Sequence, residues 1–135
     1  MRKEILLKNH IGELKRLSGF VEDIAKELNL GSELQMNLNL VLEEMVVNII
    51  SYAYPEGTQT TIGLLAEYDG RELTFVLSDQ GREFDPTLKK EADMSVNPAE
   101  REVGGMGIFI VKNIMNEVSY QRLEGTNLLT MKKEL

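Results

Sequence analysis

Cysteine and tryptophan are absent from this chain of 135 residues, and histidine occurs once, at His10. Without cysteine the chain cannot form a disulfide, a thiolate nucleophile or a zinc site with thiolate ligands. His10 lies beside Asn9 at a predicted helix start, where we expect a surface position rather than a catalytic one. These absences exclude most catalysis and metal binding based on cysteine or histidine.

Long hydrophobic runs are missing as well. No stretch approaches the roughly 20 apolar residues of a membrane-spanning helix. Residues 1–9 are too charged and too short to be a signal peptide. We therefore expect a cytoplasmic protein that has no membrane partner.

Basic residues are too few to give the chain a positive surface. The 15 lysines and arginines stand against 22 aspartates and glutamates, for a net charge of −7. This balance disfavours nonspecific binding to nucleic acids, which depends on basic surfaces, so we expect no direct nucleic-acid partner. The composition, 42% hydrophobic and 27% charged, is typical of a globular protein. At this length, residues 1–135 are expected to form one domain with a single core.

Two polar residues interrupt the most hydrophobic part of the chain. Glu44 and Asn48 are four positions apart, so on a helix they lie on the same face. Their apolar neighbours make this helix hydrophobic nearly all round, which indicates burial. Because a buried polar group without a partner is costly, the two residues either form a hydrogen-bonded pair in the core or meet a ligand.

The hydrophobic periodicity predicts a succession of helices and strands. Strands are expected at residues 4–8, 60–68, 72–79, 118–123 and 127–132, with turns at 69–70 and 124–125. Helices are expected at 11–31, at 32–54 and from 104 onward. Ser32 and Gln35 predict a capping box at the start of the second helix.

These elements predict an α+β fold, a two-layer sandwich with helices on one face of a mixed, mostly antiparallel sheet. The segment 81–103 is polar and contains Pro86 and Pro98. Structureless segments of this length are usually functional or disordered, so we expect a lid at about residues 86–103.

An acid and a glycine cluster complete the set of candidate site residues. Asp79 ends a predicted strand on the same face as Phe75 and Leu77, so it either points into a pocket or starts a turn with Gly81. Three glycines between 104 and 107 open the third helix, where free backbone N–H groups can bind phosphate. A merely flexible helix entry is the alternative. The cluster matches neither the P-loop nor the dinucleotide-binding fingerprint.

Three blocks of the sequence, in this order and spacing, resemble the ATP-binding boxes of the GHKL superfamily. That superfamily is named for gyrase, a heat-shock chaperone, histidine kinases and a mismatch-repair ATPase. Residues 44–48 resemble the N box, 79–86 the first glycine box and 104–112 the second. The segments Ser-Tyr-Ala-Tyr-Pro at 51–55 and Phe-Asp-Pro at 84–86 are most similar to the anti-sigma factor serine kinases. The resemblance extends from about residue 5 to the end of the chain.

The resemblance implies roles for the polar residues. Asn48 is the expected ligand of Mg²⁺, and Glu44 is the expected general base that takes a proton from the attacking water or hydroxyl. Glu43 ranks second as a base, because it points about 100° away around the helix. Asp79 is expected to accept a hydrogen bond from the adenine amino group of ATP, and Gly81 to let the base approach the backbone.

The resemblance also implies phosphate contacts near the lid. Gly104, Gly105 and Gly107 are expected to wrap the phosphates and to act as the hinge of the lid. Arg101 occupies a lid position at which similar proteins place an arginine near the γ-phosphate. The alternative for Arg101 is a solvated surface charge.

Three further residues belong to the implied nucleotide-binding set. Phe84 and Met106 are members of the first and second glycine boxes. Thr126 follows Gly125, at a position where the family often has a threonine near the adenine. A threonine at the start of a strand is nevertheless unremarkable on its own.

The function that the resemblance implies is that of an ATP- and Mg²⁺-dependent serine kinase. Such a kinase phosphorylates a small anti-anti-sigma antagonist and sequesters a sigma factor, and phosphorylation decides which partner it holds. One alternative is a nucleotide-dependent binding switch with negligible turnover, which needs no catalytic role for Glu44. Another is a dimerising scaffold whose pocket has degenerated. Similar proteins form homodimers, whereas a sensor histidine kinase is not expected, since no helix with a phosphorylatable histidine precedes the domain.

Overall fold

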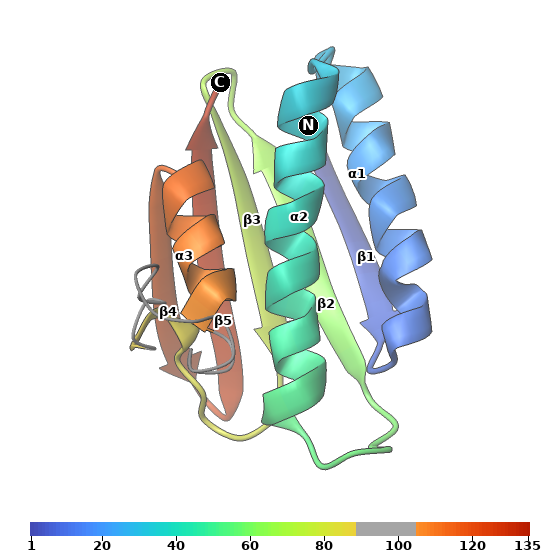
Figure 1. Ribbon diagram of the computed structural model, residues 1–135, viewed down its shortest axis with the longest axis vertical. Helices are drawn as coiled ribbons and strands as arrows, with labels where there is room; N and C mark the ends of the chain where they lie inside the picture. Colours follow the sequence, from blue (N-terminus) through green and yellow to red (C-terminus); the bar gives the residue numbers. More distant parts are fainter. Residues whose placement is uncertain (89–104) are drawn as a thin grey trace, which may run out of the picture.

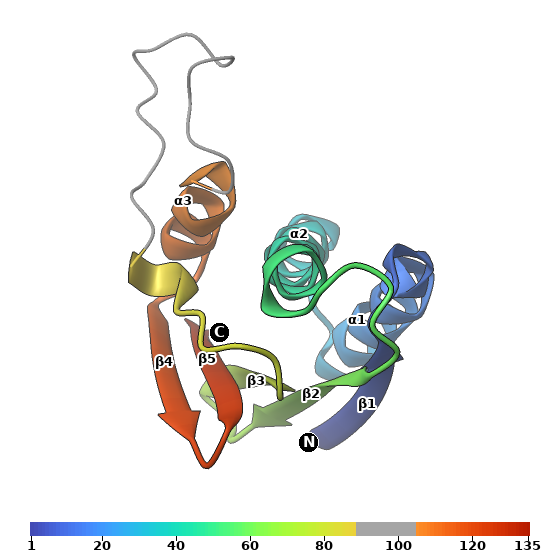
Figure 2. The same ribbon diagram turned by 90° about the horizontal axis from the view of Figure 1, so that it is seen from below.

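The computed structural model describes residues 1–88 and 105–135, and its elements form two layers (Figures 1 and 2). The helices, which all lie on one face of a single sheet, are α1 (Leu14–Leu28), α2 (Ser32–Asn48) and α3 (Gly105–Ile114). The strands are β1 (Arg2–Lys8), β2 (Thr61–Tyr68), β3 (Glu72–Asp79), β4 (Glu117–Leu123) and β5 (Thr126–Glu134). The predicted α+β sandwich is confirmed. The first residues of the expected lid form the short 3₁₀ turn η3 (Pro86–Leu88), and the rest of it lies outside the described residues.

The strand order places the end of β3 beside the start of β5. The five strands pair in the order β1-β2-β3-β5-β4, and each of these pairings is antiparallel. Because β3 and β5 are antiparallel neighbours, the end of β3 meets the start of β5. Asp79 therefore lies directly opposite Asn127, and the two side chains are on the same face of the sheet.

Alternation along the strands separates a buried face from an open one. On β2, the side chain of Leu64 is 2% exposed and lies in the core, whereas Leu65 is half-buried on the opposite face. Phe75 and Leu77 of β3 lie in the core beside Leu64. The helices complete this core through the buried residues Leu17, Phe20, Val21 and Ile24 of α1, Leu38, Val41, Leu42, Met45 and Val46 of α2, and Ile108 and Val111 of α3.

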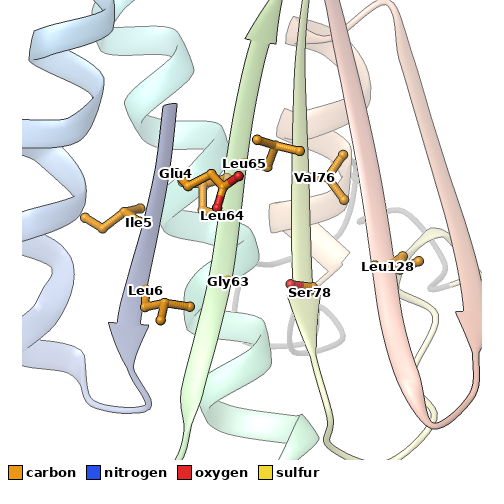
Figure 3. Close-up of a pocket in the computed structure, with 9 residues that line it drawn as sticks. All are labelled: Glu4, Ile5, Leu6, Gly63, Leu64, Leu65, Val76, Ser78 and Leu128. Atoms are coloured by element: carbon orange, nitrogen blue, oxygen red, sulfur yellow. The ribbon is translucent and has the colours of Figure 1, made fainter. Parts of the chain in front are cut away.

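The open face of the sheet carries a shallow hollow over β1, β2, β3 and β5 (Figure 3). Its apolar lining includes Leu6, Leu65, Val76 and Leu128. These side chains alternate with the buried ones, so they point away from the helices. The hollow is therefore on the opposite side of the sheet from Asp79.

α1 is preceded by a 3₁₀ turn, Ile11–Glu13, that His10 caps. The His10 Nδ1 accepts a hydrogen bond of 2.9 Å from the Gly12 backbone N–H, and the histidine is exposed, as expected from the sequence. The helix ends where Asn29 adopts the left-handed conformation (φ +54°), which is a common helix terminus. None of the helices in the described ranges is both long and apolar enough to cross a lipid bilayer.

The capping box predicted at the start of α2 is wrong. The Gly31 carbonyl accepts the first helical hydrogen bond, from the Gln35 N–H at 3.0 Å, so Gly31 is the N-cap. Ser32 is thereby already inside the helix, one position too late to act as a cap, and no side chain caps this end. At its other end α2 continues into a π-helical turn, η2 (Ile49–Ala53), and the predicted extension to about Tyr54 is confirmed.

Leu64 and Leu65 provide a matched test of the two faces of the sheet. We expect Leu64→Ala to lower the free energy of unfolding by about 2–5 kcal/mol, because it leaves a cavity in the core. Leu65→Ala removes the same atoms from the open face and is expected to cost about 1 kcal/mol or less. Urea denaturation of both variants measures the difference. Equal losses of unfolding free energy in the two variants would mean that the face carrying Leu65 is buried too.

Candidate nucleotide-binding site

Three buried polar side chains lie around one cavity. In the described ranges, the buried polar residues are Asn48, Asp79 and Asn127, which are 7%, 5% and 4% exposed. They come from the end of α2, the end of β3 and the start of β5, which lie together at the lower end of the molecule in Figure 1. The cavity has a volume of about 20 Å³, and Phe84 and Pro86 also line it. Because buried polar groups need partners, their convergence at one point identifies a candidate site.

Asp79 is held by two hydrogen bonds that end on the same oxygen. Its Oδ1 accepts from the Gly81 backbone N–H at 2.9 Å and from the Asn127 Nδ2 at 3.0 Å. Both interpretations of Asp79 from the sequence are therefore correct, since it starts a turn with Gly81 and also lines the cavity. No described residue donates to the second oxygen, Oδ2, which can therefore accept a hydrogen bond from another donor.

Asn48 has an unpartnered donor in the interior. Its Nδ2 is buried and has no hydrogen-bond partner among the described residues. The hydrogen-bonded pair of Glu44 and Asn48 that the sequence allowed is therefore not formed through this amide nitrogen. The oxygen and nitrogen of an amide exchange places by a half-turn of the side chain, so this position can present either a donor or an acceptor to a ligand. An oxygen here fits the preference of Mg²⁺ for oxygen ligands.

Glu44 lies one turn before Asn48, against the start of α3. It is half-buried. A Cβ atom built on Gly107 would lie 2.8 Å from the Glu44 Oε2, so the absence of a side chain at Gly107 leaves room for this carboxylate. The first and third sequence blocks thus meet in space. Glu43, the second-ranked base, instead accepts a hydrogen bond of 3.0 Å from the Asn39 Nδ2.

Gly81 packs against the end of the π turn. A Cβ atom at this position would lie closer to the Ala53 carbonyl oxygen than real Cβ contacts allow. The same carbonyl accepts a hydrogen bond of 2.9 Å from the Arg82 N–H. The Arg82 side chain donates to the Tyr52 carbonyl as well. The first glycine box is therefore fixed to the helix that carries the N box.

The aromatic ring of Phe84 lies beside that of Tyr52. Their centroids are 5.7 Å apart and the ring planes are inclined by 29°, which is a stacked arrangement. Phe84 also lines the cavity, so it connects the π turn with the polar site. Tyr54, two residues further along, accepts a hydrogen bond of 2.8 Å from the Gln80 N–H through its hydroxyl oxygen.

The structure brings together only some of the residues proposed from the sequence. Gly105 is the first residue of α3, and the backbone of Met106 belongs to the same first turn. Arg101 and Gly104 lie outside the described residues. Thr126 is not at the cavity, because alternation along β5 turns it to the open face of the sheet and places the next residue inside.

Asn127 and its partners were missed by the sequence analysis. Asn127 occupies the inner face of β5 together with Leu129 and Met131. A polar residue on an otherwise apolar strand face is the same signal that pointed to Asp79. Applied to the predicted strand 127–132, it would have found Asn127. The side chains of Tyr120 and Arg122, which hydrogen-bond to Asn127, could not be found in this way because neither face of β4 is fully buried.

The family model described as the histidine kinase-like ATPase domain matches residues 8–133. The chain belongs to this family. The match spans all three sequence blocks, and it confirms the superfamily suggested by their resemblance.

Similar proteins of known name are bacterial protein kinases. The serine/threonine-protein kinase BtrW of Bordetella bronchiseptica is 30% identical over 112 residues, covering 83% of this chain and 79% of that protein. The serine-protein kinase RsbW of Staphylococcus epidermidis is 28% identical, over 69% of this chain and 62% of its own. RsbW of Halalkalibacterium halodurans is 26% identical, and the match covers 83% of this chain and 70% of that protein. The chain is thus similar to kinases of this ATPase family along most of its length.

The contact between Gly81 and Ala53 makes a specific stability test possible. We expect Gly81→Ala to lower the free energy of unfolding by about 1–3 kcal/mol, because the added methyl group meets backbone atoms that cannot yield easily. Gly19→Ala in α1 is the control, since nothing lies within 4 Å of its Cβ position and alanine favours the helix by about 1 kcal/mol. If both variants had the same stability in urea denaturation, the close packing at Gly81 would be refuted.

Proposed function

We propose that this protein is an ATP- and Mg²⁺-dependent serine kinase of the anti-sigma factor type. The convergence of Asn48, Asp79 and Asn127 on one cavity, with Glu44 one turn away, carries the proposal. Membership of the histidine kinase-like ATPase family and similarity to proteins named serine kinases support it. The proposed substrate is a serine hydroxyl on a small anti-anti-sigma protein, and the second partner is a sigma factor. A cytoplasmic location is part of this proposal.

Asp79 is proposed to recognise the base. A carboxylate oxygen accepts hydrogen bonds, so Oδ2 suits the exocyclic amino group of adenine. The cavity of about 20 Å³ has room for about one water molecule, and a purine ring is larger. The side chains that line it, Phe84 among them, therefore have to move apart when the base enters.

Asn48 and the start of α3 are proposed to hold the phosphates. α3 begins at Gly105, so the N–H groups of its first turn have no partner within the helix and the helix dipole favours an anion there. Asn48 would hold Mg²⁺ through its amide oxygen, and the bound ion supplies neutralisation of the phosphate charge. The observation that supports this role is that the Asn48 Nδ2 has no hydrogen-bond partner among the described residues, because a half-turn of the amide places its oxygen at the same point.

Glu44 is proposed as the general base. Its carboxylate accepts the proton of the substrate serine while the serine oxygen forms a bond to the γ-phosphorus, and the bond from that phosphorus to the bridging oxygen of ADP breaks. Since Glu44 is half-buried rather than enclosed, a side chain of another protein can reach it. Its position against Gly107 places it beside the proposed phosphate-binding turn.

Neighbouring glutamates allow a matched test of catalysis. We expect Glu44→Gln to lower phosphoryl transfer to the partner protein at least about a hundredfold, because the amide cannot accept the proton, while ATP affinity is largely kept. Glu43→Gln changes the same group on the adjacent residue and should leave transfer near the wild-type rate. Transfer is measured with radiolabelled ATP and purified partner. Normal transfer by Glu44→Gln would remove the catalytic role, and ATP binding without transfer by the wild type would favour the binding switch.

The metal dependence tests Asn48 separately from catalysis. A ligand at a hundredfold excess over its Kd stabilises the folded state by about 2.7 kcal/mol, so ADP should raise the melting temperature measurably, and more with Mg²⁺ than without it. We expect Asn48→Ala to lose the extra increase due to Mg²⁺ and to keep the increase due to the nucleotide alone. Asn37→Ala, on the same helix, is the control. An undiminished Mg²⁺ effect in Asn48→Ala would exclude this residue as a metal ligand.

A further inference from the structure

The amide of Asn127 is fixed by four hydrogen bonds. Its Nδ2 donates to the Asp79 Oδ1 at 3.0 Å and to the Arg82 carbonyl at 2.8 Å. Its Oδ1 accepts from the Tyr120 hydroxyl and from the Arg122 Nη1 at 3.0 Å. Both N–H donors and both lone pairs of the oxygen are therefore in use.

The chemistry of these partners determines which way the amide points. A guanidinium is only a donor and a backbone carbonyl is only an acceptor. Turning the amide by 180° would therefore place N–H groups against the donor of Arg122 and an oxygen against the carbonyl of Arg82. The orientation in which Nδ2 faces Asp79 is the one that satisfies all four groups. The four partners thus determine which atom of the Asn127 amide is nitrogen and which is oxygen.

Arg122 connects this arrangement to the first glycine box. Its Nη1 also donates to the Gly81 carbonyl at 2.8 Å. The N–H of the same Gly81 donates to the Asp79 Oδ1. One guanidinium thus holds both the Asn127 amide and the turn that contacts Asp79, so β4, β5 and the turn after β3 are joined around a single carboxylate.

We propose that Asn127 is a positioning residue that orients Asp79 for a ligand carrying an amino group. Together with the Gly81 N–H it occupies Oδ1 and leaves Oδ2 as the acceptor for the base. An acceptor in a fixed direction favours adenine over purines that lack the 6-amino group. Tyr120 and Arg122 hold Asn127 through its Oδ1, and thereby set the direction of the acceptor. This inference rests on the proposed function, because it concerns the base-binding end of the same site.

The test compares two ligands that differ only in this amino group. Binding of ADP and of purine riboside 5′-diphosphate is measured by calorimetry with Mg²⁺. The wild type should bind ADP at least about tenfold more tightly. Asn127→Leu, which removes the donor to Asp79, should weaken ADP binding about tenfold and leave the binding of the purine analogue nearly unchanged, so that the preference for ADP is lost.

Two further variants keep the inference testable if Asn127→Leu folds poorly. Tyr120→Phe removes a single hydroxyl and should lower the preference for ADP by about two- to fivefold. In Asp79→Asn, adding Asn127→Leu should change ADP affinity no further, because the two residues act through one contact.

The outcomes separate this inference from the function on which it rests. Equal losses of affinity for the two ligands in the Asn127 and Tyr120 variants would mean a purely structural network and would overturn the inference. A wild type that binds both ligands equally well would overturn it too, while the proposed nucleotide site stands. A wild type that binds neither ligand would refute both.

Discussion

The hydrogen bond between Asp79 and Asn127 joins two strands at the point where the sheet order departs from the chain order. A carboxylate buried in an apolar core needs hydrogen-bond partners to offset the loss of water. Here the partners come from β5 and from the turn after β3, so the strand arrangement and the burial of Asp79 require one another. Asn48 and Phe84 line the same cavity as this pair, so the polar groups at the end of α2 face the two strands here.

Two glycines of the sequence blocks, Gly81 and Gly107, allow close packing in the site. Neither Gly81 nor Gly107 has a positive φ, so neither is required by its backbone conformation. Each instead leaves space for a neighbour: Gly81 for the Ala53 carbonyl and Gly107 for the Glu44 carboxylate. In both cases the neighbour belongs to α2 or to the turn that follows it. The N box is therefore the element against which the other two blocks are fitted.

Most of the fold could be predicted from the sequence, because period-2 and period-3.6 patterns reflect which face each element buries. The same patterns placed Asp79 at the end of a buried face and aligned Glu44 with Asn48. The same signal, a polar residue on an apolar strand face, marks Asn127 but was not applied to it. That Asn127 lies opposite Asp79 depends on pairing between distant strands, which is not visible in local periodicity. Thr126 was chosen from the family resemblance, and a shift of one residue along a strand moves a side chain to the other face. The capping box failed because a helix that starts one residue earlier takes Ser32 out of position.

The end of the π turn has no cap of its own. The carbonyls of Tyr52 and Ala53, which helix geometry leaves without partners, are satisfied by the side chain and the backbone of Arg82. The last turn of one element is thus completed by a segment about 30 positions further along the chain. Neither segment can open without exposing polar backbone groups of the other. We therefore expect residues 49–54 and 80–84 to open together in local unfolding, so that fraying of the helix end also loosens the turn after β3.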